Sequence, residues 1–201
     1  MWAGRVTGPK AMPGKYKVRL TVEGQSMETD FEILADPRSM ATPQDYQAQF
    51  DYLISVRDKL SETHLAIKQI RDVRTQINGI TESLKDRDGM EGLTDEAKDI
   101  LDRMKAIEEA LYQTQNQSGQ DPLNYPIRLN NKLAHLSSQA GVGDYPPTSQ
   151  AVEFKKEVTG DIDKELGQLK QIMSNDIPAL NQKVKDAGVD FINATPAEPI
   201  N

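Results

Sequence analysis

The chain has 201 residues, 37% of them hydrophobic, with 24 basic against 31 acidic side chains and a formal net charge of −7. This balance opposes binding to nucleic-acid phosphates or anionic lipid, and no apolar run approaches the roughly 20 residues that span a bilayer. Because cysteine is absent, a disulfide framework and a thiolate metal site are both excluded. We therefore expect no nucleic-acid partner, no membrane insertion and no cofactor.

Residues 8–34, "GPKAMPGKYKVRLTVEGQSMETDFEIL", alternate between apolar and polar side chains. This period of two predicts two β-strands, joined by a turn at Glu23-Gly24-Gln25. Lysine and arginine occupy the polar face of the first strand and acids that of the second, so we expect a charge ladder on that face. The apolar face is formed by Tyr16, Val18, Leu20, Val22, Met27, Phe31 and Ile33.

A hairpin with one apolar face is not stable by itself in water, so that face needs a cover. The sequence leaves three covers open: the helices, a third strand formed by Trp2 to Val6, or the remainder of a truncated β-sandwich. We expect the first, with Tyr16, Val18, Leu20, Phe31 and Ile33 buried against the near end of the helices. Because the sequence opens on a strand-like stretch at Trp2, we also interpret residues 1–38 as the end of a truncated β-sandwich and as a unit separate from the helices.

A long helix is predicted after Thr42, which suits an N-cap with Pro43 at the first position and Asp45 at the third. Two glycines in "DRDGMEGL" end it between Lys85 and Gly89. Along it, the following residues recur at spacings of three and four and predict one buried stripe: Leu53, Val56, Leu60, Thr63, Ile67, Ile70, Arg74, Ile77, Thr81 and Leu84.

Three further helices follow. The second is expected to start at Thr94 and to fade into "YQTQNQSGQDPLNYP"; the third, a short one, runs from about Pro126 to Gly141. Thr148 caps the fourth, which we expect to be kinked at Pro178. Residues 42–190 thus form the helical unit, and residues 191–201 an irregular tail.

The helix lengths suggest how these pieces stack. At about 1.5 Å per residue, the two short middle helices together nearly match either long helix. The fold class is therefore mainly α: an elongated antiparallel bundle of three legs, the middle one interrupted, preceded by a β-hairpin. A four-helix up-and-down bundle is the alternative.

The interruption, residues 112–131, is the stretch that amphipathic patterning explains least. It is either a structural joint or a polar binding surface. As a joint, its asparagines should bond to the backbone of neighbouring helices, its two tyrosines should pack at the break and its arginine should meet an acid. The candidate residues are Tyr112, Asn116, Asn124, Tyr125, Arg128, Asn130 and Asn131.

No catalytic or metal-binding pattern accompanies this stretch. The two histidines, His64 and His135, fall in different helices without further ligands at metal-binding spacing. Phosphate-binding loops and nucleophile elbows are missing from the sequence. The paired acids Glu108 and Glu109, like others on the helices, are expected on solvated faces beside lysines. We expect no catalytic residue in this chain.

Two segments carry a resemblance to a known family: "WAGRVTGPKAMPGKYKVRLTVEGQ" followed by "FEILADPR", and "LYQTQNQSGQDPLNYPIRLNNKLAHL". Both are similar to the C-terminal region of large bacterial β-propeller proteins of the sortilin type, built from BNR or Asp-box repeats and commonly described as glycosyl hydrolases. The resemblance implies that residues 2–38 close an immunoglobulin- or fibronectin-like sandwich behind the propellers and that residues 42–190 form a terminal helical region. The propeller repeats themselves are not present, so no catalytic or sugar-binding residue carries over.

These observations favour a non-catalytic C-terminal helical module of a larger exported protein, acting as spacer, dimerisation element or docking surface. Its partners would be the upstream propeller and sandwich domains, a second copy or another protein, and the resemblance implies a periplasmic or extracellular location. An independent intracellular coiled-coil scaffold is the alternative. A saccharide-acting enzyme would require a cleft that three packed legs do not provide.

Overall fold

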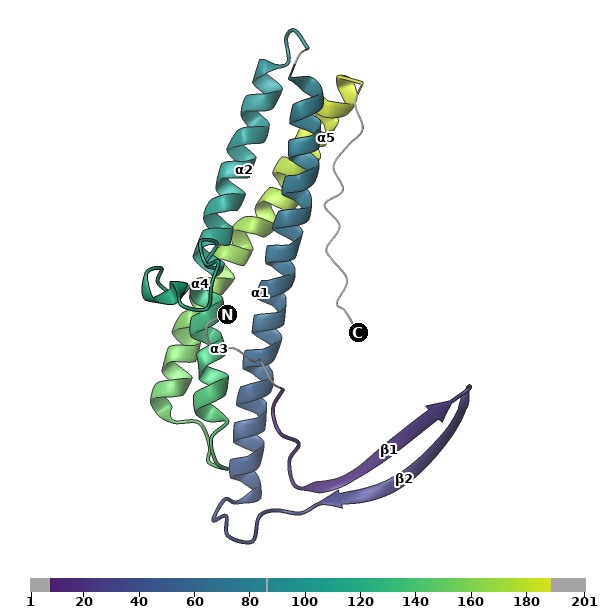
Figure 1. The fold of residues 1–201 in the computed structure, drawn as a ribbon, viewed down its shortest axis with the longest axis vertical. Coiled ribbons are helices and arrows are strands. Elements are labelled where there is room, and N and C mark those ends of the chain that lie inside the picture. The colour runs from purple at the N-terminus through teal and green to yellow at the C-terminus, as the bar shows by residue number, and fades with distance from the viewer. Residues whose placement is uncertain (1–7, 86, 189–201) are drawn as a thin grey trace.

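The computed structural model describes residues 8–85 and 87–188 and confirms a mainly helical bundle preceded by a two-stranded β-hairpin (Figure 1). The elements, in chain order, are β1 (Gly14–Val22), β2 (Gln25–Ile33), α1 (Pro43–Leu84), α2 (Glu91–Leu111), the 3₁₀ turn η1 (Asp121–Leu123), α3 (Leu129–Ala140), α4 (Ser149–Gln171), the π-helical turn η2 (Ile172–Asp176) and α5 (Ile177–Asp186). The predicted tail at 191–201 lies outside the described residues.

The bundle has three legs that run up, down and up. The first is α1, with 42 residues or about 63 Å; the second is α2 followed by α3; the third is the continuous run α4, η2 and α5. Hydrogen bonds join the first leg to the third at a near-constant sequence separation: Tyr52 with Ala151, Lys59 with Asp163, and, just beyond the ends of α1 and α5, Arg87 with Ala187. The first and third legs are therefore parallel and in register over most of their length, with the interrupted middle leg antiparallel to both.

The N-termini of α1 and α4 follow the predicted capping chemistry. Thr42 and Asp45 form the predicted capping box, and the Thr148 hydroxyl accepts a hydrogen bond from the Ala151 amide. The second helix, however, starts at Glu91 rather than at Thr94. The Thr94 hydroxyl donates to the Glu91 carbonyl inside the first turn, because the chain leaves the Gly89 turn already in helical geometry.

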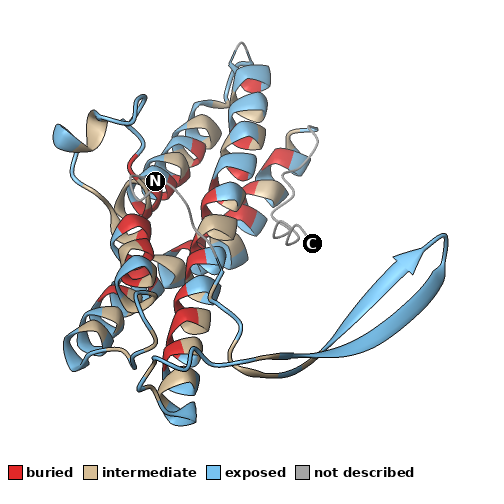
Figure 2. Cartoon of the chain, turned by 60° about the horizontal axis from the view of Figure 1, so that its bottom comes forward, coloured by how far each residue is buried: buried red, intermediate tan, exposed pale blue. Residues whose placement is uncertain are grey.

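The core is one continuous apolar seam between the three legs (Figure 2). The predicted stripe of α1 is confirmed except at Arg74 and Thr81, which are half-buried, while Val73 enters the core instead. The largest fully buried side chains are Ile70, Ile77, Leu84, Ile100, Met104, Ile107, Leu111, Leu133, Ile162, Ile177 and Leu180. Their distribution over α1 to α5 shows that all the helices share one core.

The third leg changes register just before Pro178. Its helix widens into the π turn η2, and Pro178, which lacks an amide hydrogen, occupies the first turn of α5. The extra residue in this turn lets both Ile172 and Ile177, five positions apart, face the core. The disturbance expected at Pro178 is thus a π turn.

The hairpin has the predicted strands, turn and charge ladder. Glu23 and Gly24 turn with φ angles of 50° and 81°, as in the type I′ turns that suit tight hairpins. Arg19 lies opposite Glu28 and forms an ion pair with it at 2.5 Å. The apolar pairs Tyr16–Phe31 and Leu20–Met27 share the other face.

The expected burial of that apolar face is wrong. The hairpin projects away from the lower end of the bundle (Figures 1 and 2), and only Tyr16 and Ile33 at its base are even half-buried. The remaining apolar side chains are exposed by 46% to 66%. The linkers at 8–13 and 34–42 direct the strands outward, so the helices cannot cover them; the suggested third strand, Trp2 to Val6, lies outside the described residues.

Candidate functional site

The interruption between α2 and α3 is closed at its base by one buried side chain. Gln113 donates from Nε2 to the Pro126 carbonyl at 2.8 Å, and its Oε1 accepts from the Gln115 amide at 3.2 Å. Gln113 is only 8% exposed, so these bonds form away from solvent. One amide side chain thereby joins the two ends of the loop.

The loop beyond this closure is held by its own acid. Asp121 accepts hydrogen bonds from the Gln117 and Ser118 amides at 2.5 and 2.8 Å and from the Ser118 hydroxyl at 2.7 Å. The Ser118 hydroxyl and these amides lower the pKa of the Asp121 carboxyl. The loop is therefore a compact surface loop that is stabilised by its own hydrogen bonds.

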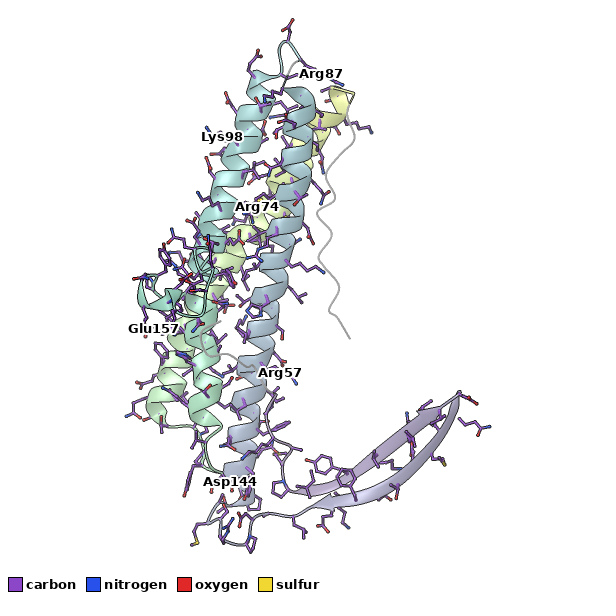
Figure 3. All side chains as sticks on the ribbon, in the orientation of Figure 1. Arg57, Arg74, Arg87, Lys98, Asp144 and Glu157 are labelled. Atoms are coloured by element: carbon purple, nitrogen blue, oxygen red, sulfur yellow. The ribbon has the colours of Figure 1, made fainter. Side chains whose placement is uncertain are left out.

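Glu108, on the last turn of α2, contradicts the expectation of a solvated face. It is 2% exposed, accepts from Arg71 Nε at 2.7 Å and pairs also with Arg74 Nη2. Arg71 in turn lies over the Tyr112 ring, 5.1 Å from its centroid. Figure 3 shows Arg74 on α1 at the level where the middle leg breaks. The four side chains fasten the end of α2 to α1.

Asn130 makes the matching connection for α3. Its Nδ2 lies 3.3 Å from Nε2 of His64 on α1, and Asn130 is 2% exposed. Burial lowers the pKa of the His64 imidazole, which favours the neutral ring. In the neutral tautomer protonated at Nδ1, Nε2 accepts the amide hydrogen of Asn130, so a side chain of α1 takes the place of the backbone partner that the sequence suggested.

The predicted site residues fall into three groups. Asn130 and Asn131 are buried in the first turn of α3, and Tyr112 and Arg128 are half-buried at the two ends of the loop. Asn116, Asn124 and Tyr125 are exposed, and among the described residues the Asn124 side chain forms no hydrogen bond with a neighbouring helix and Tyr125 is not buried at the break.

The expected acid partner of Arg128 is also missing from the described part of the chain. Its Nε is buried there without a hydrogen-bond partner. Tyr112 and Asn130 contact side chains of α1 at the two ends of the interruption.

Sequence reasoning missed the residues that close the joint. Glu108 follows Met104 by four positions and precedes Leu111 by three, so its helical spacing already placed it on the buried side of α2. Its charge led to the opposite prediction. No spacing rule identifies Gln113 or Asp121, because their partners depend on how the loop folds back.

The described residues contain neither of two further kinds of feature, a metal-binding cluster and a membrane-spanning helix. Across residues 8–85 and 87–188, no three His, Asp or Glu side chains gather to hold a metal ion. Within the same ranges, none of the helices combines the length and the apolar character needed to cross a bilayer.

The open face of the hairpin is the second candidate, as an interaction surface. Val18, Leu20, Val22, Met27 and Phe31 form a contiguous apolar strip on paired strands. In the described chain the sheet has two strands only, so β1 and β2 each present an unpaired backbone edge. Such an edge with an apolar face is suited to pairing with further strands.

Comparison of the chain with protein-family models, with curated proteins and with solved structures finds no match.

Proposed function

We propose that this chain is a non-catalytic structural module, in which the hairpin docks on a β-sheet domain of a larger protein and the bundle extends from it as a spacer. The observation that carries the proposal is the hairpin's apolar strip, exposed by 46% or more at five large side chains. An isolated two-stranded hairpin is marginal in water and gains independent stability only with further strands or a packed face.

The charge ladder supports docking by one face. Lys17 and Arg19 both pair with Glu28, at 3.1 and 2.5 Å, so two of the cations on the polar face are bound within the hairpin. A partner sheet therefore has the apolar face and the two edges available. Packing of a second sheet about 10 Å above that face would complete a sandwich.

The bundle suits a spacer because its three legs run along one elongated core. Tyr46 bonds to Asp144 at one end and Arg87 to Ala187 at the other, positions that Figure 3 shows at opposite ends of the molecule. The resemblance to sortilin-type propeller proteins extends the proposal: the sheet domain would belong to an exported β-propeller protein, with this chain at its C-terminal end.

Hydrogen exchange tests the docking. We would compare this chain with the longer protein encoded by its gene and measure amide exchange in residues 15–33. Docking on a sheet predicts slow exchange in the longer protein and fast exchange in the chain alone, because an uncovered hairpin opens readily. Amides of α1 between Leu60 and Ile77 serve as the control and should be equally protected in both.

Two outcomes contradict the proposal. Equal, fast exchange of the hairpin amides in both proteins would show that no sheet covers them. A gene that encodes no domain before this chain would remove the proposed partner, and a domain without propeller repeats would remove the assignment to a propeller protein.

A further inference from the structure

A groove runs along the outer side of the parallel pair α1 and α4, away from the middle leg. Its volume is about 620 Å³, and Leu65, Ala66, Leu166 and Met173 line it. All four are only half-buried, so they keep apolar surface open to solvent. At Gly167 nothing lies within 4 Å of the position a Cβ would take, which leaves the groove open at its middle.

The charges along the groove change sign from one end to the other. Asp163 and Glu62 lie at one end, both bound by Lys59 at 2.7 and 2.6 Å, and Lys170 lies exposed at the other. Asp163 keeps 58% of its side chain exposed, so it can accept another donor. Between the two ends lie the small residues Ala66 and Gly167.

The acidic end and the basic end of the groove are complementary to each other, so the groove can pair with the same groove of a second copy. Asp163 precedes Gly167 by four residues and Lys170 follows it by three, about one helical turn on either side. A two-fold axis through the Ala66–Gly167 level, perpendicular to the helices, would place Lys170 of each copy opposite Asp163 of the other. Surfaces that match themselves in this way form isologous dimers.

We propose that a second copy of this chain occupies the groove. Two copies associate antiparallel through α1 and α4, which gives a four-helix arrangement with Leu65, Leu166 and Met173 of both in its centre. Ala66 and Gly167 allow close approach at the axis, and two symmetric Asp163–Lys170 pairs set the register. The groove is short, so the dimer belongs to the weak class of interfaces that bury less than about 1,200 Å².

Sedimentation velocity over two orders of magnitude in protein concentration tests the dimer. The unmodified chain should shift from monomer toward dimer as concentration rises. Asp163→Lys and Lys170→Glu should each weaken dimerisation roughly tenfold or more, because each change creates two like-charge contacts. Asp161→Lys and Lys164→Glu, exposed neighbours outside the groove, make the same charge changes and should have little effect.

Mixing the two single variants gives the decisive measurement. When a copy carrying Asp163→Lys pairs with a copy carrying Lys170→Glu, opposite charges meet at both contacts, so the mixture should dimerise more strongly than either variant alone. Circular dichroism would confirm that both variants keep the helical fold.

Monomer at every concentration, or dimerisation unaffected by both charge changes, would overturn the proposal. The second result would assign the interface to another surface, such as the hairpin strip. The proposed docking of the hairpin does not depend on this dimer, because Leu20→Asp alters the hairpin alone and should leave the dimerisation constant unchanged.

Discussion

Glu108 shows how burial changes the role of a charged side chain. Its carboxylate is enclosed with two hydrogen-bonded arginines, and the surrounding contacts fasten the end of α2 to α1. Removing one member of such a group leaves the others partly desolvated and without their partner.

We predict that Glu108→Gln lowers the free energy of unfolding by about 1–3 kcal/mol, because the amide keeps one acceptor oxygen and turns its NH₂ donor toward the other arginine. Urea denaturation measures it. The adjacent Glu109→Gln is the matched control, because Glu109 lies 44% exposed and 3.9 Å from Lys105, and should change stability by less than about 0.5 kcal/mol. Equal effects of the two changes would show that Glu108 is solvated.

His64 links the stability of the joint to pH. Burial lowers its pKa in the folded chain, so the unfolded chain, with a pKa of about 6.5, binds the proton more readily. Stability from this residue is therefore fully present above about pH 6.5 and is lost as pH falls below it. Protonation would also remove the acceptor that Nε2 offers to Asn130.

We predict that the free energy of unfolding falls more steeply between about pH 7.5 and pH 5.5 in the unmodified chain than in His64→Gln. Denaturation at the two pH values measures the difference, with His135→Gln as control for the second histidine. Parallel pH dependence in the chain and in His64→Gln would exclude the contribution of His64.

In the hairpin the two strands pair with each other along their full length, but the apolar face is exposed to solvent. Leu20 is 56% exposed on it. We therefore expect Leu20→Asp to leave the melting temperature of the bundle unchanged within error, as surface changes cost less than about 0.5 kcal/mol. Leu60→Asp, at a side chain 3% exposed in α1, should unfold or severely destabilise the chain. Circular dichroism during heating measures the melting temperature. A decrease of several degrees for Leu20→Asp would mean that the face is covered in solution.

The π turn is an element with one residue more than a regular helix requires. Deleting Ser174 would bring Ile172 and Ile177 to the four-residue spacing at which both still face the core. The deletion must accompany Pro178→Ala, since proline inside a regular helix costs about 3 kcal/mol.

In the Pro178→Ala background we predict that deletion of Ser174 costs less than about 1.5 kcal/mol, whereas deletion of Gln168 costs several times more. The second deletion lies before the π turn and rotates Leu169 and Ile172, which are buried directly after it, by about 100° away from the core. Denaturant midpoints of the two variants measure the contrast. Equal losses would show that the π turn is unrelated to the core register.

The molecule as a whole consists of a cooperative bundle with an appended hairpin. Among residues 8–85 and 87–188, the largest fully buried side chains belong to the helices. We predict that a chain starting at Ser39 keeps its helical circular dichroism and one cooperative melting transition, lowered by only a few degrees. Some loss is expected because Pro13 and Ile33 line a small cavity with Phe50 and Leu53. Loss of cooperative melting would show that the hairpin is part of the core.

Local chemistry determined most of the elements. The capping box at Thr42, the turn at Glu23-Gly24 and the apolar periods along α1 and α4 each depend on residues within a few positions, so the sequence predicts them. The division into three legs followed from helix lengths. Within the joint, the buried Asn130 and Asn131 and the half-buried Tyr112 were also named from their chemistry.

Only the tertiary structure decided which faces are covered. Periodicity identifies an apolar face but not its neighbour, so the hairpin was expected to be buried where the linkers in fact direct it into solvent. Glu108 was assigned to solvent because its burial is stable only beside two arginines of another helix, and the local sequence does not show that these arginines lie there. Both depend on the direction in which distant segments meet, and a pattern of neighbouring residues does not contain that direction.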